Sequence, residues 1–478
     1  MISEALTFND VLLVPQESNI RSRKTIDLTT NLTKNIKLKT PIISSNMDTV
    51  TEEHMAIALA SNGGIGIIHR FLSIDDQVDI VKRVKRYMSY IISDPYTIHM
   101  DATLKDFKNL VISKRVKGFP VVDDYNRLVG IITNRDSLFA GDYDTVKKIM
   151  TPFNKLTYSH ISNSTTLDEA YAIMRRKKIE KLPLVGDNKK LAGLITIRDI
   201  LHHRKLNNIS TTDKKGRLMV GAAIGVKIPH DIERATALIN AGVDVLVVDV
   251  AHGHNIMAFE MVKELKTKFP DVDIIAGNVA TAEGVKYLID AGADCIKVGI
   301  GLGSICTTRM MTGCGVPQLT ALLDCVNEAN KHNIPIISDG GNGGIIGNIM
   351  KALATGASCV MLGGFLAGTD ESPGQVLIRQ GKKVKMYRGM SGFGANLSRK
   401  QNVENADDIT DVVPEGVDAY VPYKGAVKDV LFQICGGIRS GLSYCGCDKL
   451  VDLKGKGKFV KITDAGRKNS NHHSVNLI

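Results

Sequence analysis

The stretch that decides the fold reads Ala291-Gly292-Ala293-Asp294-Cys295-Ile296-Lys297-Val298-Gly299-Ile300-Gly301. Gly292 can adopt the left-handed backbone conformation that ends a helix, so the residues before it are expected to be helical. The apolar run 295–298 then reads as a short buried strand. The same helix ending recurs as Ala241-Gly242-Val243-Asp244 and Thr355-Gly356-Ala357-Ser358. This recurrence predicts a chain in which helices and strands alternate.

Eight such strands are expected, separated by amphipathic helices. They are residues 41–47, 63–69, 218–226, 243–250, 272–279, 295–300, 334–338 and 358–363. Eight short buried strands that alternate with helices predict an α/β fold of the (β/α)8 TIM-barrel type. An open, doubly wound sheet would need a Gly-x-Gly-x-x-Gly turn opening a helix after the first strand, and the chain has none.

An internal repeat interrupts the barrel after its second strand. Residues 118–136 are echoed by residues 181–199, and Pro120 and Pro183 lie 63 residues apart. Each copy reads as helix, strand, turn, strand and helix, and a duplicated unit of this size usually packs against its twin. The expected domains are residues 1–91 (first part of the barrel), 92–205 (the repeat pair) and 206–478 (second part of the barrel).

Composition narrows the class of protein. The 478 residues carry a formal net charge of +11 and no Trp, and the basic runs lack the interleaved aromatic residues that stack on bases. Nucleic-acid binding is therefore weakly supported. No apolar run reaches the roughly 18 residues of a membrane span. Eight cysteines in so long a chain fit a reducing compartment, so we expect a cytoplasmic protein.

Barrel enzymes carry their functional residues in the loops that follow the carboxyl ends of the strands. Here those loops contain Cys306, beside Thr308 and Arg309, and paired glycines that suit phosphate binding through backbone N–H groups. A thiol on an exposed loop beside a cation can ionise and act as a nucleophile. The alternative is that Cys306 is a small packed residue, as most lone cysteines are.

Several motifs carry a family resemblance. They are Gly301-Leu302-Gly303-Ser304-Ile305-Cys306-Thr307-Thr308, Gly277-Asn278-Val279-Ala280-Thr281, Gly315-Val316-Pro317-Gln318, Asp339-Gly340-Gly341, Tyr387-Arg388-Gly389-Met390 and Val413-Pro414-Glu415-Gly416. With them the chain resembles IMP dehydrogenase over nearly its full length, and GMP reductase as a sister family. The resemblance implies a purine-nucleotide oxidoreductase that acts at purine C2 through a covalent adduct with Cys306.

The resemblance also implies roles for individual residues. The catalytic residues would be Cys306, Thr308 and Glu415. An active-site flap would span about residues 391–425. The purine 5′-mononucleotide would contact Ser45, Met47, Ser304, Asp339, Gly340, Gly341, Gly363, Gly364, Tyr387, Gly389, Met390, Ser391 and Glu415. The cofactor, NAD or NADPH, would lie near Asp249, Asn278, Gly299 and Gly301.

A potassium ion is implied as well. In the family it is bound by carbonyl groups at positions that match Gly301, Gly303 and Cys306, and by the C-terminal segment of a neighbouring subunit. The matching residues of that segment are Asn469, Ser470 and Asn471, with Asn469 where a Glu is usual. A site shared in this way makes a monomer unexpected, and a homotetramer is implied.

The repeat pair resembles tandem cystathionine-β-synthase (CBS) domains, which commonly bind adenine or guanine nucleotides of the ATP or GTP type. The family resemblance assigns Asp136 and Asp199 to the ribose. Residues 94–205 contain 20 Lys and Arg against 13 Asp and Glu, an excess that suits polyphosphate ligands. The alternative is a structural pair with empty clefts.

Three functions stay open, and the sequence favours the first of them, IMP dehydrogenase, by a narrow margin. IMP dehydrogenase, which converts IMP, NAD and water to XMP and NADH, is favoured by the whole-chain resemblance and the CBS insert. GMP reductase, which converts GMP and NADPH to IMP and ammonia, is favoured because residues 391–412 lack the Arg-Tyr pair with which dehydrogenases activate water. Asn46, Asp249-Val250-Ala251, Gly364 and Ser391 also look more like a reductase. Candidates to replace the missing base are Arg399, Lys400 and the Thr308–Glu415 pair. The third reading is a non-catalytic CBS nucleotide sensor.

Overall fold

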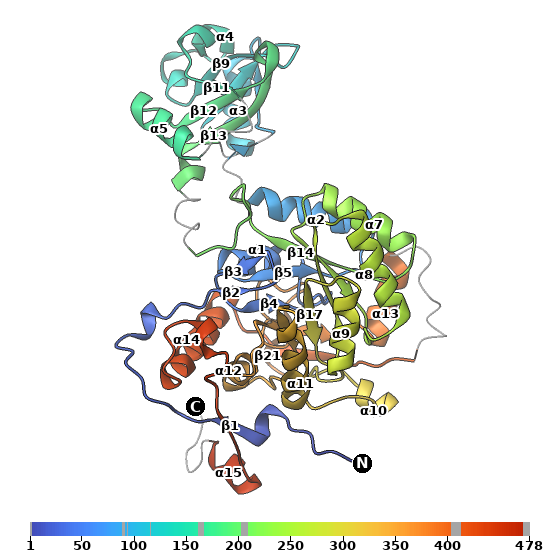
Figure 1. The fold of residues 1–478 in the computed structure, drawn as a ribbon. Helices are drawn as coiled ribbons and strands as arrows, with labels where there is room; N and C mark the ends of the chain where they lie inside the picture. Colours follow the sequence, from blue (N-terminus) through green and yellow to red (C-terminus); the bar gives the residue numbers. More distant parts are fainter. Residues whose placement is uncertain are drawn as a thin grey trace. The chain divides into compact units, whose positions relative to one another are not determined.

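The computed structural model describes residues 2–87, 91–92, 94–114, 116–160, 167–201, 209–402 and 413–471 (Figure 1). The chain divides into two compact units, each described here by itself. The first comprises Met1–Tyr87 and Ile209–Ile478, and the second comprises Met88–Asn208.

The first unit is built on a closed barrel of eight parallel strands, which confirms the predicted TIM barrel. The strand order around the barrel is β14-β15-β16-β17-β18-β19-β4-β5. The bounds are β4 Ile42–Ser44, β5 Ile65–Ile68, β14 Val220–Ile224, β15 Val245–Asp249, β16 Asp273–Val279, β17 Cys295–Val298, β18 Ile336–Asp339 and β19 Cys359–Leu362. Each lies within or close to a predicted strand, because every one is a short apolar run between a helix end and a polar loop.

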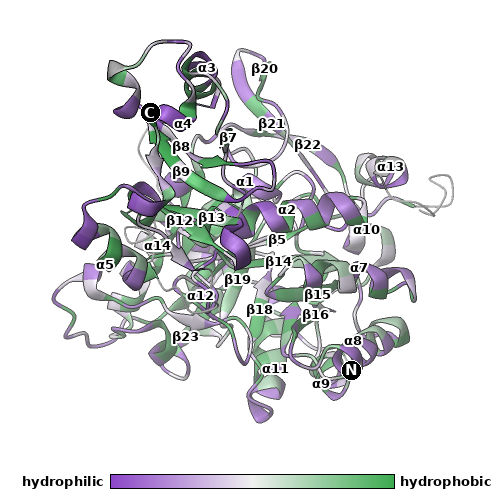
Figure 2. Cartoon of the chain, turned by 90° about the horizontal axis from the view of Figure 1, so that it is seen from above, coloured by the Kyte–Doolittle hydropathy of each residue, from purple (hydrophilic) through white to green (hydrophobic). Residues whose placement is uncertain are grey.

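Helices surround the barrel strands (Figure 1). They are α1 Glu53–Ser61, α2 Ile74–Tyr87, α7 His230–Asn240, α8 Ile256–Lys268, α9 Ala282–Asp290, α11 Gln318–Lys331, α12 Ile346–Ala354 and α14 Val427–Tyr444. Gly242, Gly292 and Gly356 follow α7, α9 and α12 with φ of 90°, 105° and 105°, in the left-handed region that the sequence predicted. Viewed from above, the strand β18 is mostly hydrophobic, whereas α2 carries a hydrophilic surface (Figure 2).

Side chains alternate across each barrel strand, and one set fills the barrel interior. Val245 and Val247 of β15, Cys295 of β17 and Ile337 of β18 belong to this buried cluster. The next residue of the same parity is Asp249 on β15, Lys297 on β17 and Asp339 on β18. The interior therefore changes from apolar to charged at the carboxyl ends of the strands.

Smaller sheets complete the first unit. β1 (Val11–Leu13) pairs with β23 (Phe459–Lys461), and β2 (Thr30–Asn31) pairs with β3 (Lys37–Leu38). β20 (Leu377–Arg379), β21 (Lys382–Arg388) and β22 (Asp418–Pro422) form an antiparallel sheet. Residues 389–417 connect β21 with β22, and the expected flap, about residues 391–425, comprises most of this connection and β22 itself. Its described part contains α13 (Phe393–Asn402), and short helices α10 (Thr308–Thr312) and α15 (Asp464–Asn469) lie elsewhere in the unit.

The second unit contains two four-stranded sheets, with orders β10-β9-β8-β7 and β11-β12-β13-β6. Their strands are β6 Ile91–Ile92, β7 Ile98–His99, β8 Gly118–Val122, β9 Leu128–Thr133, β10 Thr151–Pro152, β11 Ser159–His160, β12 Lys181–Val185 and β13 Leu191–Thr196. Each copy of the repeat supplies a helix, α3 (Leu104–Lys114) or α5 (Leu167–Lys177), and two antiparallel strands. Val122 and Leu128 of one copy pack with Val185 and Leu191 of the other, so the twins share a core.

One sequence expectation for this unit was wrong in detail. The barrel was expected to extend to residue 91, but Ile91 pairs with Ile195 in the sheet of the second unit, because β6 adds an edge strand to β13. Each copy was also expected to end in a helix. The first copy ends in a 3-10 helix, Asp136–Phe139, and residues 197–201 of the second copy form an α-helix.

None of the helices in the described ranges combines the length and the apolar character that crossing a membrane would require.

Candidate active site

A cavity of about 630 Å³ opens at the carboxyl ends of the barrel strands. This volume falls in the range of small-molecule sites. The structure brings together here the residues expected to serve catalysis, the substrate and the cofactor, together with three expected carbonyl positions of the metal site. They are Ser45, Met47, Asp249, Asn278, Gly299, Gly301, Gly303, Ser304, Cys306, Thr308, Asp339, Gly340, Gly341, Gly363, Gly364, Tyr387, Gly389, Met390, Ser391 and Glu415.

The loop after β17 carries the candidate nucleophile. The Sγ atom of Cys306 lies 3.2 Å from Oγ1 of Thr308, and the backbone N–H of Cys306 donates to the carbonyl of Gly303 at 3.1 Å. The backbone N–H of Thr307 donates to the carbonyl of Glu415 at 2.9 Å. The segment with Cys306 and Thr308 is therefore joined through its backbone to Glu415, which also lines the cavity and lies more than a hundred residues away in sequence.

Arg309 shapes this loop rather than pointing freely at the thiol. Its Nε donates to the carbonyl of Ile300 at 3.2 Å, and its Nη2 donates to the carbonyl of Val316. A Cβ atom at Gly301 or Gly315 would lie 2.5 Å from the Arg309 side chain. Both positions also have positive φ, of 70° and 156°. The glycines are therefore needed for the close passage of the arginine and for the turn.

The glycine-rich wall of the cavity offers backbone donors. Residues 340–344 contain four glycines with positive φ, namely Gly340, Gly341, Gly343 and Gly344. Asn342 lies among them with 6% of its surface exposed, and its Oδ1 has no hydrogen-bond partner among the described residues. Successive N–H groups in such a conformation suit an anion.

Tyr387, on β21, also lines the cavity. Burial, against a hydrogen bond with Ser304, raises the pKa of its phenol to about 12. The hydroxyl group therefore keeps its proton at neutral pH and can donate a hydrogen bond. A Cβ atom at Gly363 would lie only 2.8 Å from the Tyr387 Oη. The absence of a side chain at Gly363 therefore leaves room for the phenol.

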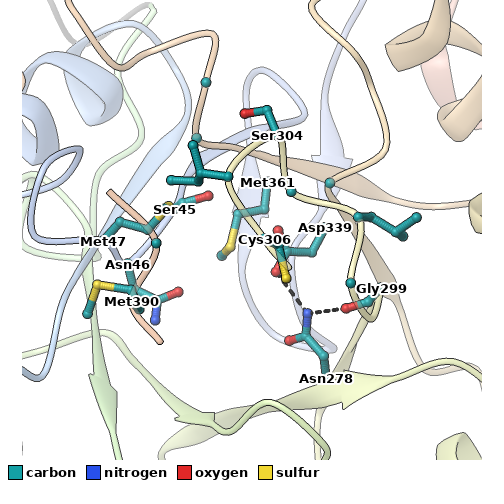
Figure 3. Close-up of a pocket in the computed structure, with 18 of the residues that line it drawn as sticks. Ser45, Asn46, Met47, Asn278, Gly299, Ser304, Cys306, Asp339, Met361 and Met390 are labelled. Atoms are coloured by element: carbon teal, nitrogen blue, oxygen red, sulfur yellow. Dashed lines mark hydrogen bonds between the residues drawn. The ribbon is translucent and has the colours of Figure 1, made fainter. Parts of the chain in front are cut away.

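Sequence reasoning missed Lys297. Its Nζ lies 3.0 Å from Asp249 Oδ1 and 3.0 Å from Asp339 Oδ2, and also donates to Asn278 Oδ1. Asn278 in turn donates from Nδ2 to Asp339 Oδ2 at 3.0 Å and to the carbonyl of Gly299 at 2.6 Å (Figure 3). The sequence signal for Lys297 was a charged residue inside an otherwise apolar strand. Arg70, Phe71 and Met361, also not predicted, line the cavity too.

The start of the flap is attached to the barrel by an ion pair. Arg388 donates to Asp48 Oδ2 from Nε at 2.8 Å and from Nη2 at 2.5 Å. The two methionines Met47 and Met390 then lie on one side of the cavity, and Asn278 lies on another (Figure 3). The backbone N–H of Glu415 donates to the carbonyl of Ser391 at 3.0 Å, which joins the two ends of the flap.

The arginine of the flap does not line the cavity. The Arg399 guanidinium lies 5.6 Å from the centre of the Phe71 ring, and Phe71 is 4% exposed. Lys400 does not line the cavity either. The flap residues 403–412 lie outside the described residues.

Two sets of expected residues are not among those that line this cavity. Asn469, Ser470 and Asn471 lie at the end of α15, and in the described part of the chain no hydrogen bond joins them to the loop 299–306. Within the same part, no group of three or more His, Cys, Asp or Glu side chains is arranged to hold a metal. Asp136 and Asp199 lie in the second unit, where each accepts through Oδ2 from a threonine, at 2.7 Å from Thr133 and 2.6 Å from Thr196.

Comparison with known proteins gives a consistent result. The model of the family described as "IMP dehydrogenase / GMP reductase domain" matches residues 5–473. The chain is 50% identical to inosine-5′-monophosphate dehydrogenase of Nitrosopumilus maritimus, over 99% of both chains. It is 48% identical to GMP reductase of Leishmania donovani, over 100% of this chain and 98% of the relative. A crystal structure of a cysteine-to-alanine variant of GMP reductase from Trypanosoma brucei, in complex with guanosine 5′-monophosphate, superimposes with a TM-score of 0.91 at 44% identity, over 99% of each chain.

Proposed function

Because this chain belongs to the IMP dehydrogenase / GMP reductase family of oxidoreductases, we propose that it works as a GMP reductase. The sequence alone narrowly favoured the dehydrogenase. Two features of the cavity support the reductase instead. Thr308 and Glu415, which could assist the removal of ammonia, line it, and the described flap residues that line it include no Arg-Tyr pair.

The observation that carries this proposal is the position of the flap's cations. A dehydrogenase must hydrolyse its covalent intermediate, and the loss of a general base costs roughly 10² to 10⁴ in rate. Residues 391–412 contain no tyrosine and one arginine, Arg399, which lies on the Phe71 ring instead of lining the cavity. A reductase needs no such base, because water takes no part in its reaction.

The proposed chemistry uses Cys306 first. Its thiolate adds to C2 of GMP, and the exocyclic amino group takes up a proton and leaves as ammonia, which leaves a thioimidate on the sulfur. A bound reduced nicotinamide cofactor would supply the hydride that C2 needs. On the protein's side, Cys306 then departs as the thiolate and IMP is released. The overall balance is GMP, NADPH and two protons giving IMP, NADP⁺ and ammonium.

Thr308 and Glu415 are the proposed proton carriers. Oγ1 of Thr308 lies 3.2 Å from the Cys306 sulfur, and the backbone of Glu415 is bonded to that of Thr307. A carboxyl group acting through the hydroxyl can bring the proton that the departing amino group needs. The glycine-rich wall, Ser304 and Tyr387 would bind the phosphate, and Asp339 would accept hydrogen bonds from the ribose.

The remaining proposed ligands are the cofactor, a potassium ion and the nucleotides of the second unit. The cofactor would lie on the side of Asp249 and Asn278. Potassium stays a prediction: the Gly303 carbonyl accepts one hydrogen bond and keeps a second lone pair for an ion. Its completion by residues 469–471 of another subunit, and the homotetramer, also stay predictions. In the second unit, nucleotide binding at Asp136 and Asp199 would use Oδ1, since Oδ2 of each is bonded to its threonine.

IMP dehydrogenase is the second candidate, because the relative of that name from N. maritimus is 50% identical over almost the whole chain. Thr308 and Glu415 would then have to activate water. One spectrophotometric comparison separates the two reactions. We expect the purified protein to oxidise NADPH when GMP is added and to form no NADH from IMP and NAD. NADH formation without GMP-dependent NADPH oxidation would overturn the proposal, and the Cys306→Ala variant is the control for both assays.

A further inference from the structure

We propose that Lys297 is a positioning residue that holds the ribose-binding carboxylate of Asp339 and joins it to Asp249 and Asn278 on the cofactor side. The inference rests on the proposed function for its ligands, but it holds for either direction of the reaction. It gives a role to a buried cation that the chemistry at Cys306 does not use.

The position of Lys297 follows from the strand. Cys295 of β17 lies in the buried interior cluster, and Lys297 is the next residue on the same face. Its side chain is 3% exposed, so the ammonium group lies at the floor of the cavity and not in solvent. A buried ammonium is costly unless it is paired. Its persistence here therefore depends on the carboxylates around it.

Its partners come from three different strands. Asp249 ends β15, Asn278 lies on β16 and Asp339 ends β18, and each offers an oxygen to the three protons of the ammonium group. Lys297, on β17, thus links the strands that lie on the two sides of β17. Burial would lower the pKa of Lys297, but the charges of Asp249 and Asp339 outweigh burial and raise it, so the group stays charged.

The arrangement orients Asp339 toward a ligand. Both bonds that Asp339 receives, from Lys297 and from Asn278, end on Oδ2, and its side chain is 23% exposed. No hydrogen bond to Oδ1 is present among the described residues, so this oxygen is available to a ribose hydroxyl. A neutral side chain at residue 297 would leave Asn278 as the donor to the carboxylate and weaken its hold. Hydrogen bonds from the ribose to this charged group contribute about 1.5–3 kcal/mol each when well placed, so their loss costs roughly 10- to 10²-fold in affinity.

The same bonds reach the other half of the cavity. Asn278 accepts from Lys297 through Oδ1, which leaves its Nδ2 to donate to Gly299 and Asp339. Asp249 accepts a hydrogen bond from the same ammonium group. Removal of the charge is therefore expected to affect the binding of both ligands, although Lys297 contacts the two sides only through other residues.

The chain contains a matched control. Lys85 is 4% exposed and its Nζ lies 2.9 Å from Asp213 and 2.8 Å from Asp244, but it does not line the cavity. Lys85→Met also removes a buried lysine from two carboxylates. A purely structural role for Lys297 would make the two variants alike: both would lose stability and neither would change ligand recognition.

The test is a binding cycle on the full chain. Dissociation constants of GMP and of 2′,3′-dideoxy-GMP are measured by calorimetry for the wild type, Lys297→Met and Lys85→Met. We expect Lys297→Met to weaken GMP binding roughly 10- to 10²-fold and dideoxy-GMP binding by less than about 3-fold, because the second ligand lacks the hydroxyls that Asp339 would accept. Lys85→Met should leave both constants unchanged.

Equal losses for the two ligands, or no loss for either, would overturn the inference. If Lys297→Met does not fold, Lys297→Gln keeps an N–H donor without the charge and gives the same cycle. The cycle repeated with IMP and 2′,3′-dideoxy-IMP separates the two proposals. A hydroxyl-dependent loss with IMP in a protein that does not reduce GMP would uphold the role of Lys297 and remove the proposed reaction.

Discussion

Replacing Gly363 by alanine tests the proposed phosphate site at Tyr387 by adding one methyl group. The added Cβ atom would lie 2.8 Å from Tyr387 Oη, 3.3 Å from Met47 Sδ and 3.4 Å from Ser45 Oγ. Gly363 has no positive φ, so the substitution adds no backbone strain and acts through contact alone. All three neighbours are expected substrate-binding residues, which makes the change a probe of that site.

The size of the effect follows from the closest contact. Ordinary contact begins at about 3.4 Å, so the phenol must move by about 0.6 Å to admit the methyl group. A hydrogen bond to a charged group such as a phosphate contributes about 1.5–3 kcal/mol, and moving the phenol would weaken it. We therefore expect Gly363→Ala to weaken GMP binding by about 10-fold, or about 1.4 kcal/mol. The dissociation constant of NADPH should change little.

Two further variants make the assay decisive. In Tyr387→Phe the oxygen is gone, so adding Gly363→Ala to it should cost no further GMP affinity. Gly436→Ala on α14, where an added Cβ atom meets nothing within 4 Å, should bind GMP like the wild type. If Gly363→Ala also binds GMP like the wild type, the phosphate is not held at Tyr387 and the reasoning fails.

Three other outcomes follow from the site. Cys306→Ala should lower turnover, measured by steady-state rates, by more than about 10³-fold, while calorimetry still shows GMP binding. Unchanged turnover would contradict the assignment of Cys306 as the nucleophile. Arg388→Met leaves Asp48, which is 9% exposed, without its cation, so the free energy of unfolding in urea should fall by about 3 kcal/mol, and Asp48→Asn in the same chain should restore part of it. Burial alone would raise the pKa of Asp249, but Lys297 and Arg70 lower it further than burial raises it, so Asp249 adds stability above its unfolded pKa of about 3.9 and loses it as the pH falls through the lower folded pKa. Asp249→Asn should therefore flatten the acid limb of stability below about pH 4, and an unaltered acid limb would contradict this.

The barrel was predictable because its signals are local. Gly242, Gly292 and Gly356 end helices in the left-handed conformation, and the apolar runs that follow are long enough only for strands. The rule that barrel sites lie after the carboxyl ends of strands then placed Cys306 and Asp339 at one cavity without any long-range information.

The misses arose where tertiary contacts decide. Lys297 is a single charge in an apolar run, and only its partners on three strands give it meaning. Arg399 was a candidate base from its place in the flap, but its contact with Phe71 depends on how α13 packs. Ile91 was assigned to the barrel because two residues of a strand carry too little pattern to show which sheet they join.

The most direct test of the central claim follows the exocyclic nitrogen of GMP. GMP labelled at its amino group is incubated with NADPH and the full chain, and labelled ammonia is measured beside NADPH oxidation. We predict one ammonia released for each NADPH oxidised, and no release from the Cys306→Ala variant. Absence of labelled ammonia from a folded wild-type protein that converts IMP and NAD to XMP and NADH would contradict the account.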